Sequence, residues 1–457
     1  DDLKRDIMVA GDGHCWEAAV DQLVQFGPKL VREYLIERFH VHFDKNKDED
    51  LDLTAEGAHS HPRIIHSKDQ TGLSIHKSVL KYLVEHPNIE IYRDHTAVDL
   101  MTLSHHSVNS LDIYKKPACF GAIMLNNETS EIFSVYASQT ILATGGLGQI
   151  FLHTSNPPES TGDGIALAWR AGARCFNLQY IQFHPTTLFS EHDRFLMSES
   201  MRGEGAVLRD KNGKEFMSEY HEMGNLAPRD IVARSIHQVM LNTGHPCVYL
   251  DISHKDGEWI KDRFPTIYDH CREAGFDMTE EPVPVVPAAH YSCGGVGVSL
   301  KGRTSLQRLY AVGEVACTGV HGANRLASTS LLESVVWGYI AGKEAAKKSE
   351  FTNYFPEIHP WEEENESIDP ALIQQDWHNI KSTMWNYVGL IRTRHRLERA
   401  QTNLRHLQTE VEQFYQRAKM TRATVELRHG VQTATAIAAQ TYQDRTSRGA
   451  HFLVEEE

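Results

Sequence analysis

The sequence predicts an α/β protein in which a parallel sheet is interrupted by an inserted α+β domain and followed by a C-terminal helical bundle. Two stretches carry the prediction. "TILATGG" runs into the helical "STGDGIALAWRAGA", and "RLYAVGEVACTGVHGANRLASTSLLESVVWGYIAGKEAAKK" repeats the order of strand, glycine loop and helix. That order is typical of parallel sheets that bind a ligand at the carboxyl ends of their strands.

The N-terminal stretch "DIMVAGDGHCWEAAVDQLVQF" contains Gly11-x-Gly13, which is similar to the start of a dinucleotide-binding loop. The third glycine of a G-x-G-x-x-G fingerprint would fall at Trp16, whose indole would keep the helix from closing on the strand. We therefore expect a loop and N-cap that lead into amphipathic helices rather than a nucleotide site.

The first of the two units is preceded by a predicted hairpin. "FGAIMLNNETSEIFSVYASQTILATGG" contains two β-rich runs around an Asn-Asn-Glu-Thr turn, and then a strand that we expect to be buried and to end in glycines. We expect the sequence that follows to form a capped helix, with Thr161 or Asp163 near its N-terminus and Gly172 near its end. In the second unit we expect a strand to Val312 and a helix from about Ser330.

These units set the expected domain boundaries. We expect a discontinuous main domain over 1–180 and 291–350, a capping domain over 181–290, a Pro- and Glu-rich linker over 351–370, and a helical domain over 371–457. The helical domain contains four closely spaced arginines, which favour a solvated or interdomain face over a ligand site. They are Arg392, Arg394, Arg396 and Arg399.

Charge and cysteine usage narrow the function classes. A formal net charge of -15 argues against nucleic acid or an anionic membrane as the partner. The seven cysteines are scattered without a C-x-x-C pair, which is typical of a reducing compartment and of a protein without a zinc or iron–sulfur site. Since no apolar run reaches membrane length and no signal peptide opens the chain, we expect a cytoplasmic location.

Six segments together resemble the flavoprotein family of succinate dehydrogenase, fumarate reductase and L-aspartate oxidase. They are "QFHPTTL", "RGEGAVLRD", "LAPRDIVARSI", "PVVPAAHYSCGGV", "GRTSLQRLYAVGEVACTGVHGANRLASTSLLE" and "SRGAHF". Three further stretches are most similar to the L-aspartate oxidase branch: "EGAHSHPRIIH", "EPVPVVPAAHY" and "WNYVGLIRTRHRLERA". The resemblance implies a Rossmann-like FAD-binding domain interrupted by the capping domain, with FAD bound non-covalently.

The resemblance also implies a segment that precedes the one given. Members of the family begin with a strand, a G-x-G-x-x-G loop and a helix that hold the FAD pyrophosphate, and this sequence starts after them. About one βαβ half-unit, on the order of 30 residues, is missing by that comparison. We expect a truncated or cleaved chain rather than a natural protein without the segment.

The substrate that the resemblance implies is a C4-dicarboxylate. Its two negative charges require cations and fixed donors at both ends of a pocket. The resemblance implies that His184, His290 and Arg325 hold the carboxylates, and that Arg229 sits beside the reacting carbons and moves a proton. Taken alone, the two histidines would be ordinary loop or core residues, and Arg229 could be a helix N-terminal arginine paired with Asp230.

Three more residues are expected at the substrate. Glu56 lies where aspartate oxidases carry a glutamate, and a carboxylate near the α-amino group would separate aspartate from succinate by charge. The alternative for Glu56 is a solvated loop acid. Gln182 and Ser198 would supply hydrogen bonds to a substrate carboxylate.

For the cofactor, the resemblance implies that Glu314 accepts hydrogen bonds from ribityl hydroxyls. The N-terminus of the helix at Ser330 and Leu331 would face the flavin edge that becomes negative on reduction. The expected contacts are Ala143, Thr144, Gly145, Gly146, Asp163, Gly313, Glu314, Ser330 and Leu331. We expect no metal site.

The implied activity is the oxidation of L-aspartate to iminoaspartate, with oxygen (giving H2O2) or fumarate as electron acceptor. In the family this is the first step of de novo NAD biosynthesis, and quinolinate synthase is the implied partner that takes the imine. Two alternatives stay open: a soluble fumarate reductase or succinate dehydrogenase flavoprotein, and a flavin-less paralogue or fragment that acts as a binding subunit.

Overall fold

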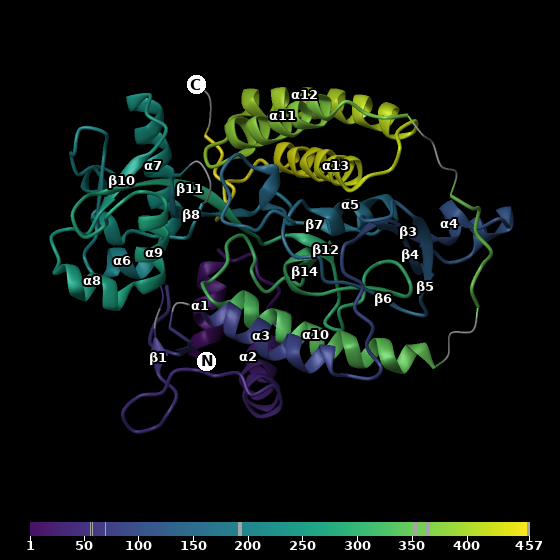
Figure 1. The fold of residues 1–457 in the computed structure, drawn as a ribbon, viewed down its shortest axis with the longest axis horizontal. Coiled ribbons are helices and arrows are strands. Elements are labelled where there is room, and N and C mark those ends of the chain that lie inside the picture. Colours follow the sequence, from purple (N-terminus) through teal and green to yellow (C-terminus); the bar gives the residue numbers. More distant parts are fainter. Residues whose placement is uncertain are drawn as a thin grey trace.

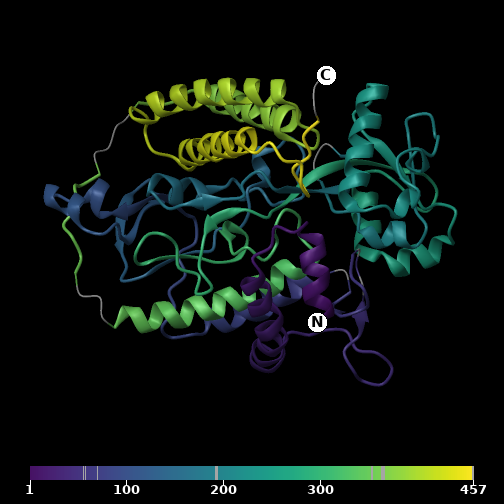
Figure 2. The ribbon, with the colours of Figure 1, turned by 180° about the vertical axis from the view of Figure 1, so that it is seen from behind.

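A computed structural model of the chain describes residues 1–54, 56, 58–68, 70–190, 194–350, 354–361 and 366–454. Short sheets form the middle of the molecule (Figure 1). Three C-terminal helices cover one side of them: α11 (Pro370–Val388), α12 (Arg394–Tyr415) and α13 (Arg422–Gln443). The long helix α10 (Thr329–Ser349) and the helix α2 (Glu17–Leu30) pack together on the opposite side, as the view from behind also shows (Figure 2).

The predicted parallel pairing is confirmed. β6 (Thr140–Leu142) pairs in parallel with β13 (Leu309–Ala311), and these strands lead towards α5 (Asp163–Arg170) and α10. The expectation of a wholly buried first strand is wrong at Ile141, whose side chain is 40% exposed. Among the described residues β6 pairs only with β13, so part of this strand remains uncovered.

The predicted hairpin is also confirmed. β4 (Cys119–Asn126) and β5 (Ile132–Tyr136) are antiparallel, and β3 (His95–Thr102) adds to the other edge of β4. A second small sheet contains β14 (Ala316–Cys317), β12 (Gly295–Gly297) and β7 (Cys175–Phe176). Short 3-10 turns occur at Ser110–Tyr114, Gly148–Ile150, Met217–Glu219, Gly224–Leu226 and Gly313–Val315.

A four-stranded antiparallel sheet forms one end of the molecule (Figure 1). Its strands, in spatial order, are β8 (Ile181–Leu188), β11 (Val283–Ser292), β10 (Val248–Asp251) and β9 (Val207–Arg209). Its helices are α6 (Glu199–Gly203), α7 (Arg229–Thr243), α8 (Gly257–Arg263) and α9 (Pro265–Glu273). This region has its own apolar core, which includes Leu208, Val232 and Val285. Below, we call it the capping region.

The N-terminal segment is helical, as expected, and contains no strand before its glycine turn. α1 (Asp2–Ala10) leads through Gly11–Gly13 into α2, and a π-helix continues over Val31–Arg38. A small hairpin and two helices follow: β1 (Leu53–Thr54), β2 (Ile64–Ile65), α3 (Thr71–Val84) and α4 (Leu103–His106). One face of α2 buries Leu23 against Val336 and Trp337 of α10.

The C-terminal helices share the largest apolar core with α5 and the central strands. Of the two surroundings expected for the arginine cluster, a solvated or an interdomain face, Arg392 has the second: it is fully buried and contacts Gln179, which lies outside the C-terminal helices. Its guanidinium donates hydrogen bonds to the carbonyl oxygens of Val388, Gly389 and Gln179, which replace water around the charge. None of the described helices is long and apolar enough to cross a membrane.

Candidate active site

Adjacent strands β8 and β11 bring two predicted histidines together. Tyr291 pairs with Gln182, and a register shift just before Tyr291 leaves His290 as the extra residue of a bulge. The rings of His184 and His290 meet edge to face, with centroids 5.5 Å apart. Both side chains therefore lie in one site, although they are far apart in the sequence.

Burial and neighbouring cations keep both rings neutral. Burial lowers the pKa of His184 well below its usual value, and the positive charge of Arg229 lowers it further. The pKa of His290 is lowered by burial and then by Arg325 and Arg229. Positive charge is thus concentrated around two neutral imidazoles, an environment that favours an anionic ligand.

The other ring nitrogens are oriented by local hydrogen bonds. Nδ1 of His184 accepts a hydrogen bond from the Thr186 N–H at 3.2 Å, and Nδ1 of His290 lies 2.8 Å from Oγ of Ser155, whose hydroxyl can donate to it. These contacts leave Nε2 of each ring to meet a ligand. A neutral imidazole with Nε2 protonated is a hydrogen-bond donor to a carboxylate.

Arg325 is buried, with 8% of its surface exposed. Its Nε donates to Oε1 of Gln182 at 3.1 Å, its Nη1 donates to Oγ of Ser330 at 2.9 Å, and its Cζ lies 4.6 Å from the centroid of the Tyr291 ring. In the described part of the chain, no carboxylate forms an ion pair with Arg325. The direct hydrogen-bond partners of this buried guanidinium are neutral, and Glu314 acts on it only through its charge, so the guanidinium can still take a carboxylate in direct contact.

Arg229 is the first residue of α7 and contacts an acid on α6. Its Nε donates to Oε2 of Glu199. The alternative pairing with Asp230 is wrong, because Asp230 lies one turn before Arg234 and pairs with it at 2.6 Å. Arg229 therefore points away from its sequence neighbour and toward α6.

Glu199 and Arg202 were not identified from the sequence as individual site residues. Arg202 is 2% exposed, its Nη2 lies 4.0 Å from Oε1 of Glu199, and its Nη1 donates to the carbonyl oxygen of Asn225. Burial lowers the pKa of Arg202 to about 10. The available signal was the spacing of an acid and an arginine on one helical face, three residues apart in "SESMRGEG".

Glu199 lies between Arg202 and Arg229 and so connects the interior of the capping region to the histidines. Arginine and glutamate alternate along this line, which we call the Arg202–Glu199–Arg229 row. A carboxylate in hydrogen-bond contact with a guanidinium can exchange a proton with it when a third group presents or removes one. The row ends at Arg229, which acts electrostatically on both histidines.

The remaining predicted substrate residues occupy the edges of this cluster. Ser198 is the N-cap of α6, where its Oγ accepts from the Ser200 N–H at 3.3 Å. Glu56 is exposed and accepts a hydrogen bond of 2.9 Å from Oγ of Ser328. Since Ser328 directly precedes α10, Glu56 contacts the segment that also contains Arg325.

The predicted cofactor residues gather at the carboxyl ends of β6 and β13. Glu314, in the turn after β13, accepts a 3.0 Å hydrogen bond from the Ser292 N–H, and burial raises its pKa to about 7. Gly146 lies against this carboxylate so closely that a Cβ at residue 146 would collide with it. Gly313 has a positive φ of 68°, which glycine adopts without strain. The backbone at Gly146, which follows β6, thus lies against the side chain of Glu314, which follows β13.

The surface beside these residues fits a flat, partly apolar cofactor. Ala143, Thr144 and Gly145 are exposed after β6, and Ile141 within it is 40% exposed. Leu331, in the first turn of α10, is 46% exposed. Helix α10 is long, and the N–H groups of its first turn form a positive end beside Glu314. Uncovered apolar groups next to a helix N-terminus suit a flavin ring with a developing negative charge.

Asp163 is held by protein groups. Thr161 donates a 2.5 Å hydrogen bond to its Oδ1, and Nδ1 of His429 on α13 lies 3.2 Å from the same oxygen. Asp163 is the first residue of α5, so it lies at the N-terminus of the helix as expected, and the N-cap itself is Gly162. The Asp163 carboxylate ties α5 to the C-terminal helices, and a cofactor role for it remains a proposal.

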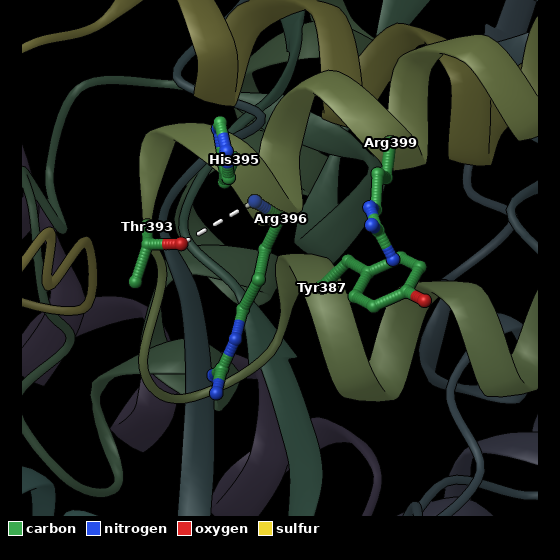
Figure 3. A pocket seen from close by; sticks show the side chains of 5 residues that line it. All are labelled: Tyr387, Thr393, His395, Arg396 and Arg399. Carbon is green, nitrogen blue, oxygen red and sulfur yellow. Dashed lines mark hydrogen bonds between the residues drawn. The ribbon is translucent and has the colours of Figure 1, made fainter. Parts of the chain in front are cut away.

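A separate cavity of about 400 Å³ lies between the end of α11 and the start of α12 (Figure 3). It is lined by Tyr387, Thr393, His395, Arg396 and Arg399. The Thr393 hydroxyl caps α12 by accepting from the Arg396 N–H at 3.3 Å. This cavity includes none of the predicted substrate or cofactor residues.

Comparisons with known families match almost the whole chain. A model of the FAD binding domain matches residues 1–331, and a model of the fumarate reductase flavoprotein C-terminal region matches residues 377–456. The L-aspartate oxidase of Pseudomonas aeruginosa is 43% identical over 98% of this chain and 84% of its own length. A chloroplastic L-aspartate oxidase of Nicotiana tabacum is 36% identical over 99% of this chain and 72% of its own length.

Solved structures give the same picture of the fold. Quinol fumarate reductase FrdA of E. coli is similar with a TM-score of 0.85 and 25% identity, over 99% of this chain and 81% of that one. Mycobacterium smegmatis Sdh1 is similar with a TM-score of 0.81 and 28% identity, over 99% and 78% of the two chains.

Proposed function

This chain belongs to the FAD-dependent flavoprotein family that contains fumarate reductases and L-aspartate oxidases, and we propose that it oxidises L-aspartate to iminoaspartate. The observation that carries the proposal is the buried Arg325, which has neutral hydrogen-bond partners and no carboxylate in an ion pair within the described residues. A dicarboxylate would supply a carboxylate in direct contact with it. The identity of the relatives favours aspartate over succinate as that dicarboxylate.

The proposed binding mode uses residues from both sides of the site. Arg325 and Nε2 of the two neutral histidines, His184 and His290, hold the carboxylates, while Gln182 keeps the guanidinium of Arg325 in place. Ser198 adds a hydroxyl from the capping region. Because Arg325 precedes α10 and the histidines lie on the capping sheet, substrate binding would join the two regions.

FAD is the family's cofactor, and when bound it would supply a two-electron acceptor for the hydride of the substrate α-carbon. Glu314, Gly146 and the N-terminus of α10 at Ser330 and Leu331 would hold it, with Glu314 as a hydrogen-bond acceptor. The positive end of α10 favours the reduced form, because negative charge develops next to it. Ala143, Thr144, Gly145 and Asp163 belong to the same proposal.

The chain's own groups handle the proton. The substrate's α-ammonium group must first lose one proton to become an amine, and loss of a hydride from the α-carbon must then be accompanied by loss of a second proton from nitrogen to give the neutral imine. Arg229 sits beside the histidines, and Glu199 is the base in direct contact with its Nε. We propose that the Arg202–Glu199–Arg229 row carries this proton away from the reacting atoms.

Discrimination between aspartate and succinate is proposed for Glu56. Aspartate carries an α-ammonium group and succinate does not, so a carboxylate at this end of the pocket attracts one and repels the other. The hydrogen bond from Ser328 attaches Glu56 to the segment that follows Arg325. In this proposal, Glu56 matches the positive α-ammonium group of aspartate, and Arg325 matches a negative carboxylate.

Three finer points complete the proposal. Oxygen, giving H2O2, or fumarate reoxidises the enzyme, and the reaction is the first step of de novo NAD biosynthesis. Quinolinate synthase is the partner proposed to consume the imine, since an imine hydrolyses in water. The seven cysteines, which are all free, fit a cytoplasmic location.

An anaerobic titration tests the function. L-Aspartate added to the purified holoenzyme should bleach the flavin absorbance in one turnover, and admitted oxygen should restore it and release H2O2. Succinate should bleach it much more slowly. Bleaching by succinate but not by L-aspartate would replace the proposal with a succinate dehydrogenase activity.

A further inference from the structure

Asp6 of α1 is a buried acid that the reaction does not use directly. It is 7% exposed. Its Oδ2 accepts three hydrogen bonds: from the Ser60 N–H at 2.9 Å, from Ser60 Oγ at 2.8 Å and from Nη2 of Arg63 at 2.8 Å. Both partners lie in the loop between β1 and β2, so a single carboxylate oxygen fixes that loop to α1.

The same loop is attached to the candidate active site on its other side. Nε2 of His59 donates to the carbonyl oxygen of Ala327 at 3.0 Å, and Ser328 donates to Glu56 at 2.9 Å. Ala327 and Ser328 connect Arg325 to α10. The loop therefore lies between a buried acid on α1 and the segment that supplies the proposed carboxylate-binding arginine.

The hairpin is also held at its β2 end, where Ile65 packs against an apolar cluster and His66 contacts Asp44 and Asp52. β1 and β2 each contain two residues, and a ladder of that length is marginal without packing.

Burial would raise the pKa of the Asp6 carboxyl, but the hydrogen bonds from Ser60 and the contact with Arg63 outweigh burial and hold this pKa below its usual value. The acid is thus ionised, and its three donors form a charge-assisted contact between the loop and α1.

We propose that Asp6 is a positioning residue for amine recognition: through Ser60 and Arg63 it holds the loop so that Glu56 stays beside Ser328 and faces the substrate's α-ammonium group. Asp6 does not touch substrate in this proposal. The inference rests on the proposed function of Glu56, and it adds the device that places that residue.

The experiment is a double-mutant cycle on the FAD-loaded enzyme, with Asp6→Asn, Glu56→Gln and the double variant. We measure kcat and KM for L-aspartate and the inhibition constant of succinate. Asp6→Asn should lower kcat/KM for L-aspartate by roughly three- to tenfold, mainly through KM, because it weakens a charge-assisted contact of the loop. Succinate inhibition should not weaken, and in the Glu56→Gln background Asp6→Asn should have no further effect.

Asp2→Asn is the matched control. Asp2 lies on the same helix, is 51% exposed and pairs at 3.2 Å with Arg5, which also lies 3.8 Å from Oδ1 of Asp6, so its loss changes the charge near Asp6 without removing any donor to Oδ2. Its kinetics should equal those of the unaltered enzyme. Ser60→Ala, which removes one of the three donors from the loop side, should reproduce a smaller part of the Asp6→Asn effect and serves if Asp6→Asn does not fold.

The outcomes separate the inference from its premise. If Glu56→Gln itself leaves aspartate kinetics unchanged, the proposed role of Glu56 fails and the role of Asp6 fails with it. If Glu56→Gln has its effect but Asp6→Asn and Ser60→Ala have none, only the positioning role is overturned. Additive losses in the double variant, or equal losses for aspartate and succinate, would show that Asp6 supports the fold in general.

Discussion

The guanidinium of Arg325 lies over the aromatic ring of Tyr291, and the Tyr291 hydroxyl donates a 3.0 Å hydrogen bond to the fully buried Glu333. The ring places π-electron density against the cation, and Glu333 fixes the ring. Thr318 and His321 also contact the Glu333 carboxylate. The Arg325 guanidinium is therefore held in place by the Tyr291 ring, which is itself fixed by Glu333, before any substrate binds.

Arg325→Leu should abolish aspartate turnover and weaken fumarate binding while the fold survives. A hydrogen bond to a charged group is worth roughly 1.5–3 kcal/mol, so the loss in binding should be about tenfold or more. The measurements are kcat/KM for aspartate, the inhibition constant of fumarate and the thermal midpoint. Near-normal kinetics would remove Arg325 from the pocket.

Arg229→Lys should leave ligand binding largely intact while the chemical step collapses. Lysine's single ammonium cannot reproduce the planar fork that faces Glu199, and proton transfer by a positioned group contributes roughly a hundredfold or more. Stopped-flow reduction of the flavin by aspartate measures the step, and fumarate affinity measures binding. A lysine variant that keeps most of its reduction rate would make Arg229 a structural residue.

Local sequence patterns predicted the elements whose cause is local. The hairpin around Asn126 and the parallel pairing of β6 with β13 follow from strand periodicity and glycine loops. The meeting of His184 and His290 depends on a register shift in the capping sheet, which no pattern within either strand reveals. For these two residues, the family resemblance predicted a shared site, which the periodicity of the strands could not predict.

Exposure was hardest to predict where tertiary contacts decide it. A solvated face was one of the two surroundings expected for Arg392, but it lies between α11 and α12, where the carbonyl oxygens of Gly389 and Gln179 take the place of water. Ile141 looks buried by its composition, but β6 has one strand neighbour among the described residues. The signal for Glu199 was only its spacing of three residues from Arg202, and an acid near a loop is ordinarily solvated.

Gly146→Ala should weaken FAD binding without unfolding the protein. The added methyl group would collide with the Glu314 carboxylate, which can rotate away but then leaves the position proposed for the ribityl hydroxyls. Loss of one hydrogen bond to a charged acceptor predicts a dissociation constant raised about tenfold. Flavin fluorescence quenching measures it.

Gly338→Ala is the control for that variant. Gly338 lies inside α10 in open space, so a methyl group there meets nothing and should leave FAD affinity unchanged. Equal affinities for the Gly146→Ala and unaltered proteins would separate Gly146 from the cofactor site.

Glu314 should make the flavin-free protein less stable as the pH rises. Its pKa is raised by burial from 4.5 to about 7, so the folded state binds this proton more tightly than the unfolded state. The contribution to stability is complete below pH 4.5 and is lost as the pH rises through about 7. Glu314→Gln stays neutral and should lose less stability between about pH 5 and about pH 8. Thermal midpoints of both proteins across this range test it, and parallel curves would contradict it.

Glu56→Gln should separate aspartate from dicarboxylates that lack an amine. The change removes an attraction for the α-ammonium of aspartate and a repulsion for succinate, so aspartate turnover should fall while succinate binding holds or improves. Two unit charges about 4 Å apart are worth about 4 kcal/mol at an effective dielectric of 20. Glu56 is exposed, so solvent screens this attraction. We expect the preference for aspartate over succinate, measured as kcat/KM for aspartate and the inhibition constant of succinate, to change by about tenfold.

General damage to the fold would weaken the binding of both ligands together, so it cannot lower aspartate turnover while succinate binding holds or improves. Equal losses for the two ligands, or an unchanged kcat/KM for aspartate, would return Glu56 to the status of a solvated loop acid and favour the dehydrogenase activity.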